Sequence, residues 1–224
     1  MKLNIFVCLC LCLTIGNAFK ILSIVAVGNK SIHYLFLALS KILTDNGHNV
    51  TFVSKFPVPH EYENLNHIKI TDLNKTTREK DLFFKSSSEI FKYFEEVVEE
   101  IAIKMWTDPE IQRLLETKNE YDAIIIPSSL NEITFPLLQD YPGSIILFSD
   151  SSVEYFSISY MGNWLSPAVT PNMIIHYDEY MTFFERTVNL VSLITTKIYL
   201  HHITYPKFQK IIERFFPDIG DVLR

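Results

Sequence analysis

The stretch from residue 21 to residue 53 constrains the fold most. Residues 21–27 form a nearly continuous apolar, β-branched run that ends at Gly28. A parallel strand that is covered on both faces requires such a run. Apolar residues then recur at helical spacing, and residues 50–53 form a second apolar run. A strand, a helix and a strand in this order predict a right-handed βαβ unit.

The signals for the ends of this helix are local. Ser31 is the predicted N-cap, because a serine hydroxyl accepts a hydrogen bond from a free amide of the first turn. The pattern continues to Asn46, and Gly47 is expected to close the helix.

Strand and helix patterns keep alternating along the chain. Further strands are expected at residues 67–71, 124–126 and 145–148, and helices at about residues 83–101, 108–118, 131–138 and 182–204. In the helix expected near residues 83–101, the acidic run 95–100 is interpreted as a solvated face. The alternation predicts the α/β class, as a Rossmann-like parallel sheet with flanking helices.

Length and charge limit the domain count and the partners. The chain has 224 residues, of which 48% are hydrophobic and 21% charged, and its net charge is −6. This length supports one domain with a sizeable core. A nucleic-acid partner is not expected, because phosphate binding needs a basic face and the sequence has no run of Lys or Arg.

Residues 1–18 have the pattern of a signal peptide. Lys2 precedes an apolar run that is too short to span a bilayer, and small residues end the segment at Ala18. We therefore expect a domain of residues 19–224 in the secretory pathway, either in the endoplasmic reticulum lumen or secreted. All three cysteines, Cys8, Cys10 and Cys12, lie in the signal segment, so no disulfide is expected in the domain. No further membrane span is expected, since Asn189 and Lys197 interrupt the late apolar run.

Three acceptor sequons follow the signal segment, at Asn29, Asn49 and Asn74. In a chain that enters the secretory lumen, each is a candidate for N-glycosylation.

Ligands of open parallel sheets bind beyond the carboxyl ends of the strands. Residues 28–34, 127–132 and 148–152 are expected at that edge. The first of these segments has one glycine only, which does not fit a dinucleotide fingerprint, so we expect no cofactor and an uncharged, largely apolar ligand. No metal site is expected either: His201 and His202 are adjacent on a helix and are interpreted as surface or capping residues.

Several quoted stretches together resemble a known family. They are "DNGHNVTFVS", "YDAIIIPSSLNE", "WLSPAVTPNMIIHYDEYMTFFERTVNL" and "YPKFQKIIERFFPDIGDVLR". In this order, they are similar to the N-terminal half of animal UDP-glycosyltransferases, closest to the insect branch. Thr182 and Glu185 in the third stretch also form a capping-box pattern.

The resemblance implies one half of a GT-B fold, in which two Rossmann-like domains face a cleft. The N-terminal half holds the acceptor, a small lipophilic alcohol or phenol, and the other half binds the UDP-sugar. The chain lacks the family's donor motif and its membrane anchor, so a fragment or truncated product is expected. Otherwise, a separate donor-domain partner supplies the rest; a homo-oligomer is also considered.

The resemblance also implies a catalytic pair: a histidine that removes the proton of the acceptor hydroxyl, and an aspartate that orients it. By the family's spacing, the histidine belongs at position 32, which is Ile32, and the aspartate at position 127, which is Pro127. His33 is the candidate base, one residue out of register, and Glu132 is a substitute for the carboxylate.

Three function hypotheses remain. In the first, the chain is the acceptor half of an inverting UDP-glycosyltransferase, inactive by itself, whose pocket is lined by Ser31, Tyr34, Ser128, Leu130 and Phe148. In the second, it is a binding module for a small apolar ligand that has lost catalysis. In the third, it is a generic flavodoxin-like domain with an unrelated ligand. Under the first hypothesis, some of the apolar residues in the tail are expected to be uncovered, from the set Phe208, Ile211, Phe215 and Phe216.

Overall fold

The computed structural model describes residues 18–70, 87–128, 131–149, 162–163, 165–172, 175 and 177–221. Its strands are β1 (Lys20–Val25), β2 (Asn49–Ser54), β3 (Leu65–Lys69), β4 (Ala123–Pro127) and β5 (Ser144–Phe148). They form one parallel sheet in the order β3-β2-β1-β4-β5. The predicted Rossmann-like α/β class is confirmed, although β1 ends two residues earlier than expected and β3 begins two residues earlier.

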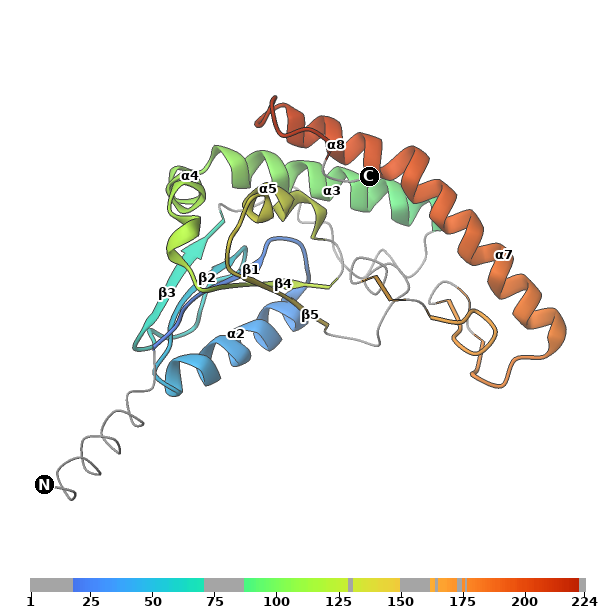
Figure 1. Ribbon diagram of the computed structural model, residues 1–224, viewed down its shortest axis with the longest axis horizontal. Coiled ribbons are helices and arrows are strands. Elements are labelled where there is room, and N and C mark those ends of the chain that lie inside the picture. Colours follow the sequence, from blue (N-terminus) through green and yellow to red (C-terminus); the bar gives the residue numbers. More distant parts are fainter. Residues whose placement is uncertain are drawn as a thin grey trace, which may run out of the picture.

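Helices cover both faces of this sheet (Figure 1). The α-helices of the described residues are α2 (Lys30–Asp45), α3 (Ser87–Thr107), α4 (Pro109–Glu116), α5 (Phe135–Leu138), α7 (Phe183–Tyr199) and α8 (Tyr205–Glu213). In the figure α2 lies on one side of the sheet, and α3, α4, α5 and α8 lie on the other. Asp108 caps α4 as expected, while the helix predicted at residues 131–138 is split into a 3₁₀ turn, Glu132–Thr134, and α5.

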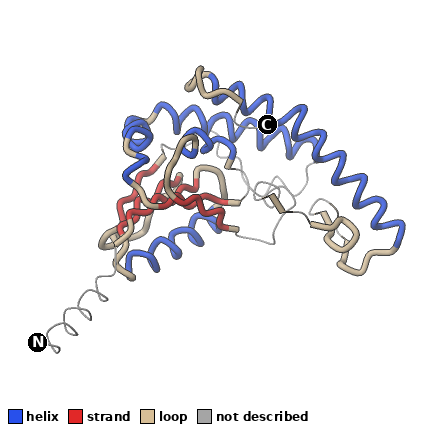
Figure 2. The backbone as a smooth tube through the Cα atoms, in the orientation of Figure 1, coloured by secondary structure: helices blue, strands red, loops and turns tan. Residues whose placement is uncertain are grey.

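Alternate residues of the central strands fill two cores. Ile21 and Val25 face α2 and pack with Phe36, whereas Leu22 and Ile24 pack in the larger cluster with α3 and α8. The central strands are therefore buried on both faces, as their apolar runs predict. The strands stand out as the middle layer in Figure 2.

The expectation that the tail is uncovered is wrong. Phe208 and Ile211 are only 4% and 5% exposed, and Phe215 and Phe216 are partly buried against the same core. The Phe216 ring meets that of Trp106 edge-on, with 4.8 Å between centroids. The tail packs because its apolar residues recur every three or four positions and give α8 an apolar face.

Ion pairs hold the same tail on α3. Lys207 pairs with Glu95, and Arg214 pairs with Glu99 at 3.0 Å. Part of the acidic run in α3, interpreted as merely solvated, therefore binds the tail.

Exposed apolar side chains occur instead along α7. The capping box predicted at its start is present: the Thr182 side chain accepts from the Glu185 amide, and the Glu185 carboxylate accepts from the Thr182 amide. The predicted single helix to residue 204 continues as a π-helical segment, Leu200–Thr204, and then as α8. Figure 1 shows α7 extending beyond the sheet.

Candidate functional site

The strand order reverses between β1 and β4, since β1 continues to β2 and β3 on one side and β4 to β5 on the other. In open parallel sheets, ligands bind beyond the carboxyl ends of the strands at such a switch point. Here that edge carries the turn after β1, with Gly28 and Asn29, and the turn after β4, which includes Asn131.

Asn29, not Ser31, caps α2. Its side-chain oxygen accepts a hydrogen bond from the Ile32 amide at 3.0 Å, and the helix begins at Lys30. The prediction for Ser31 is therefore wrong: asparagine is as good a cap as serine, and Ser31 is already in the first helical turn.

Ile32 lies behind the turn that follows β1. Gly28 has a φ of +153°, a conformation that side chains rarely adopt, and a β-carbon there would lie 3.4 Å from the Ile32 side chain. Ile32 is partly buried and packs on the core beneath α2. Position 32, where the resemblance predicts the base, thus lies next to the switch point and holds a hydrocarbon side chain.

His33 points in another direction. Its side chain is 0% exposed, and its ring centroid lies 5.3 Å from that of Phe52 and 5.5 Å from that of Phe56. Both aromatic residues belong to β2 or to the loop after it. Neither ring nitrogen of His33 makes a hydrogen bond of good geometry among the described residues, although the Pro57 backbone lies close enough to act on the ring.

The surroundings favour the neutral form of His33. Burial lowers the pKa of His33 below its ordinary value of 6.5, and the nearby His67 lowers it further. The backbone of Pro57 acts in the opposite direction, as a carbonyl oxygen does when it faces an imidazole. A buried neutral histidine has the protonation state of a base, but in this position it has no access to a substrate hydroxyl.

Two more polar side chains lie near His33, and sequence analysis missed both: Ser54, which is buried, and His67, which is partly buried. The Ser54 hydroxyl lies 3.1 Å from the Phe56 carbonyl, to which it can donate, and 3.0 Å from Nε2 of His67. Which of the two groups donates in the contact between Ser54 and His67 depends on the tautomer of the His67 ring. Burial, and next the charge of Lys69, lower the pKa of His67. The alternation of β3 could have shown that His67 and Ile68 face opposite sides.

On the other side of the switch point, Asn131 is buried after β4. Its amide nitrogen donates to the Pro127 carbonyl at 2.6 Å, and its side-chain oxygen has no partner among the described residues. Ser128 is buried as well, and its amide donates to the Phe148 carbonyl. Asn131 is thus a polar group at the expected ligand edge, and no sequence motif marked it.

The remaining predicted site residues are spread along this edge. Ser31 and Tyr34 are exposed, while Phe148 is partly buried and meets the Phe36 ring edge-on at 5.2 Å. Glu132 is partly buried. It makes no hydrogen bond of good geometry with either ring nitrogen of His33. Leu130 lies outside the described residues.

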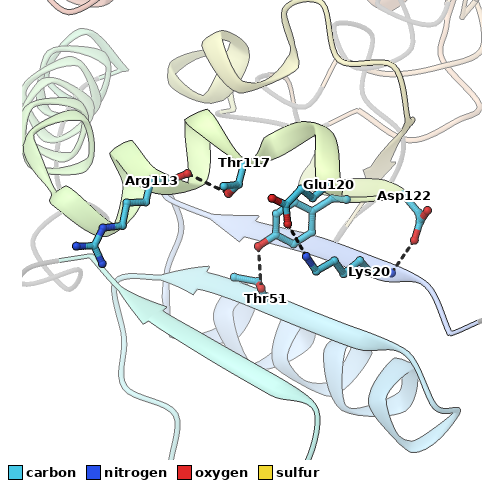
Figure 3. Close-up of polar contacts among 7 residues, drawn as sticks. Lys20, Thr51, Arg113, Thr117, Glu120 and Asp122 are labelled. Atoms are coloured by element: carbon cyan, nitrogen blue, oxygen red, sulfur yellow. Dashed lines mark hydrogen bonds and ion pairs between the residues drawn. The ribbon is translucent and has the colours of Figure 1, made fainter.

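Asp122 is held at the opposite edge of the sheet, as its position at the start of β4 predicts. Its carboxylate accepts from the Lys20 amide at 2.7 Å, and the Lys20 side chain pairs with Glu120 (Figure 3). The Tyr121 hydroxyl donates to that of Thr51 in the same group. These contacts join the amino ends of β1 and β4 and exclude Asp122 from the switch point.

Other sequence features are placed as follows. Asn29 and Asn49 are exposed, and Asn74 lies outside the described residues. His201 and His202 are exposed in the π-helical segment. Within the described part of the chain, no three side chains form a group suited to a metal ion. Among the helices described, none combines the length and the apolar character needed to cross a bilayer.

Comparison with known proteins gives two relatives from Dactylopius coccus. UDP-glycosyltransferase UGT5 is 26% identical over 187 residues, which are 79% of this chain and 35% of that protein. UDP-glucosyltransferase 2 is 23% identical over 226 aligned positions, which cover 93% of this chain and 42% of that protein. The chain therefore spans well under half the length of these relatives. No family model matches it.

One solved structure is loosely similar. The C-terminal domain of a hydrogenase from Pyrococcus furiosus covers 58% of this chain at 13% identity, with a TM-score of 0.29. A likeness this low supports no conclusion about the protein.

Proposed function

We propose that this chain is the acceptor-binding part of a UDP-glycosyltransferase, one half of a GT-B fold. The observation that carries the proposal is the similarity to two such enzymes over 79% and 93% of the chain. The five-stranded parallel sheet, with its switch point between β1 and β4, agrees with it.

The expected acceptor is a small lipophilic alcohol or phenol. Ile32 and Phe148 offer apolar surface near the switch point, and Tyr34 adds an exposed ring. The Asn131 side-chain oxygen, without a partner among the described residues, is an acceptor that a ligand hydroxyl could use after a small opening of the turn. The hydroxyl of such a ligand would be recognised there, and its carbon skeleton by the apolar side chains.

In the complete reaction, a base takes the proton of the acceptor hydroxyl, and the oxygen attacks the anomeric carbon of a UDP-hexose. UDP leaves with the bonding electron pair, and the configuration inverts. The UDP-sugar would be bound by a second domain, on the same or another chain. His33 can serve as the base only if its ring leaves the contacts with Phe52 and Phe56.

The second candidate is a binding module that has lost catalysis. A specific observation favours it: the side chain beside Gly28 is Ile32, while His33 is fully buried toward β2. Pro127, at the family's carboxylate position, accepts the Asn131 amide with its backbone oxygen and has no side-chain acid. Both candidates keep the same acceptor site and differ only in the transfer step.

Calorimetry tests the shared part of the proposal. The purified chain should bind a small phenol such as 1-naphthol with a Kd in the micromolar range, and Ile32→Asp should weaken binding at least tenfold. Ile42→Asp is the matched control, because Ile42 is on the outer face of the same helix and is 59% exposed. UDP-glucose should give no heat. Binding of UDP-glucose, or phenol binding that ignores Ile32→Asp, would contradict the assignment.

A chimera with the donor domain of a UDP-glycosyltransferase separates the two candidates. If His33 is the base, His33→Ala should lower transfer about 10²- to 10⁴-fold. If catalysis has been lost, the chimera should be inactive, and Ile32→His combined with Pro127→Asp should give it activity. Transfer that is unaffected by His33→Ala would show that His33 is not the base, and Glu132 would be the next residue to replace.

The proposed location is the secretory pathway, in the endoplasmic reticulum lumen or outside the cell, with Asn29 and Asn49 as exposed candidates for glycosylation. Treatment of secreted chain with an N-glycosidase should increase its gel mobility, and Asn29→Gln with Asn49→Gln should reduce that change.

A further inference from the structure

The two sides of α7 differ in what they contact. On the inner side Asn189 is fully buried: its amide donates to the carbonyls of Pro167 and Thr170, and its oxygen accepts from the Asn172 amide. Leu193, one turn later, is also buried. The inner side of α7 is therefore occupied by residues 165–172 of the same chain.

The opposite side is apolar and exposed. At 100° per residue, six large side chains fall on the side away from Asn189. Their exposed fractions lie between 41% and 87%. We call this surface the α7 outer face; it consists of Phe183, Phe184, Leu190, Val191, Ile194 and Ile198.

The polar groups of this face are satisfied within the helix. Thr187 donates its hydroxyl to the Phe183 carbonyl at 2.9 Å, and Thr195 donates to the Val191 carbonyl at 2.8 Å. Both threonines can therefore present their methyl groups to a partner. The charged residues of the helix, Glu185, Arg186 and Lys197, fall about 80° or more from the mean direction of the six side chains.

The spacing of the side chains on the α7 outer face is suited to packing against a second, antiparallel copy of α7. Phe184, Val191, Ile194 and Ile198 follow steps of seven, three and four residues, the spacing of a helix–helix seam. Phe184 and Ile198 stand seven residues on either side of Val191. Thr187 lies four residues before Val191, and Thr195 lies four residues after it. An antiparallel copy related by a two-fold axis at Val191 would place Phe184 against Ile198, and threonine against threonine.

The area fits a stable dimer. With about 200 Å² for a fully exposed large side chain, the six exposed fractions amount to about 700 Å² per copy, close to the roughly 800 Å² that each partner contributes to a standard interface. A lipid surface fits less well, because interfacial helices are rich in Lys and Arg on the polar side. α7 has two such residues, and Arg186 already donates to the Met181 carbonyl.

We propose that the α7 outer face is a two-fold interface between two copies of this chain, with antiparallel α7 helices that cross near Val191. The contact is isologous, since each copy contributes the same surface. The switch point is not part of this face, because the turn after β1 and α7 lie apart in the fold (Figure 1).

Sedimentation velocity on the purified chain tests the interface. A dimer is expected at about 10 μM, and Val191→Asp should raise its Kd at least 100-fold. Ile42→Asp should leave the dimer unchanged; Ile42 matches Val191 in exposure, at 59% against 57%, but lies on α2. A monomer at 100 μM, or equal effects of the two variants, would overturn the proposal.

Cross-linking tests the geometry without weakening the seam. In a chain with Cys8, Cys10 and Cys12 replaced by serine, Val191→Cys should form a covalent dimer under mild oxidation, whereas Ile42→Cys should not. Mixing Phe184→Cys with Ile198→Cys should link the two different variants. Links between identical Phe184→Cys chains alone would contradict the antiparallel arrangement.

The same experiments would reveal two other partners for the α7 outer face, a lipid surface or another part of a longer polypeptide. A monomer that floats with phosphatidylcholine vesicles, and loses this property in Val191→Asp, would assign the face to lipid and refute the dimer. A monomer that neither binds vesicles nor forms the Val191→Cys link would indicate another part of a longer polypeptide, which also refutes it.

Discussion

Replacing His33 by phenylalanine removes two buried nitrogen atoms and keeps a ring of similar size in place. The His33 side chain is fully buried against Phe52 and Phe56, and neither nitrogen makes a hydrogen bond of good geometry among the described residues. A buried polar group without a hydrogen bond costs about 1–3 kcal/mol. Removing the two nitrogens therefore stabilises the fold. Phenylalanine is slightly larger than histidine, and such core substitutions cost up to about 1.5 kcal/mol, which offsets part of that stabilisation.

We therefore expect His33→Phe to stabilise the fold by about 1 kcal/mol at pH 7.5, which raises Tm by about 2–4 °C for a chain of this size. The difference should increase in acid. The pKa of His33 is lowered from 6.5 by burial, so the unfolded state binds more protons below that pH. Stability of the native sequence should thus be full above about pH 6.5 and fall from there toward the folded-state pKa, by at most about 1.4 kcal/mol per pH unit.

Urea unfolding at pH 7.5, 6.5 and 5.5 measures both effects. His60→Phe is the control, because His60 is exposed. The reasoning fails if His33→Phe destabilises the fold at pH 7.5, or if the difference between variant and parent stays constant as the pH falls. It also fails if His60→Phe gives the same pH-dependent gain.

Three further variants test the packing. Asn189→Leu should cost about 2–4 kcal/mol in urea unfolding, because three backbone groups of residues 165–172 lose their partners; equal stability of variant and parent would contradict this role. Thr182→Ala should cost about 1 kcal/mol through loss of the capping box, and less than 0.3 kcal/mol would indicate that the box is frayed. Phe208→Ala should cost about 3–5 kcal/mol, as expected for a core aromatic, whereas a change below about 1 kcal/mol would mean that the tail is detached.

The sheet could be predicted because its signal is local and strong. Residues 21–27 are nearly all apolar and residues 124–126 are all apolar, and short β-branched runs of this kind are typical of a parallel strand covered on both faces. The capping box of Thr182 and Glu185 was equally predictable from its spacing. Both inferences depend on neighbours in the sequence alone.

The orientation of His33 could not be predicted in this way. The sequence predicts the cap at Ser31, but Asn29 accepts the hydrogen bond of the first-turn amide, so the helix begins earlier than predicted. An offset of one residue turns a helical side chain by about 100°, enough to separate a side chain beside the switch point from one beneath β2. Ser54 and His67 were missed because strand pairing, not sequence proximity, brings them together.

The tail shows a different kind of error. Its exposure was inferred from the absence of a second domain, although Phe208, Ile211 and Ile212 already have the spacing of a buried helical face. α7 was harder to interpret, because apolar residues occur on both of its sides, and only the contacts of Asn189 identify the inner one.

The position of the acceptor is the central claim, and methyl NMR tests it most directly. With isoleucine methyl groups labelled, titration with 1-naphthol should shift the Ile32 signal and leave the signal of Ile42, on the outer face of α2, in place. Ile194 reports in the same spectrum on the α7 outer face. A saturable shift of Ile32 alone would agree with an acceptor site at the switch point. Shifts confined to Ile194, or an unchanged Ile32 signal at saturating ligand, would contradict the account.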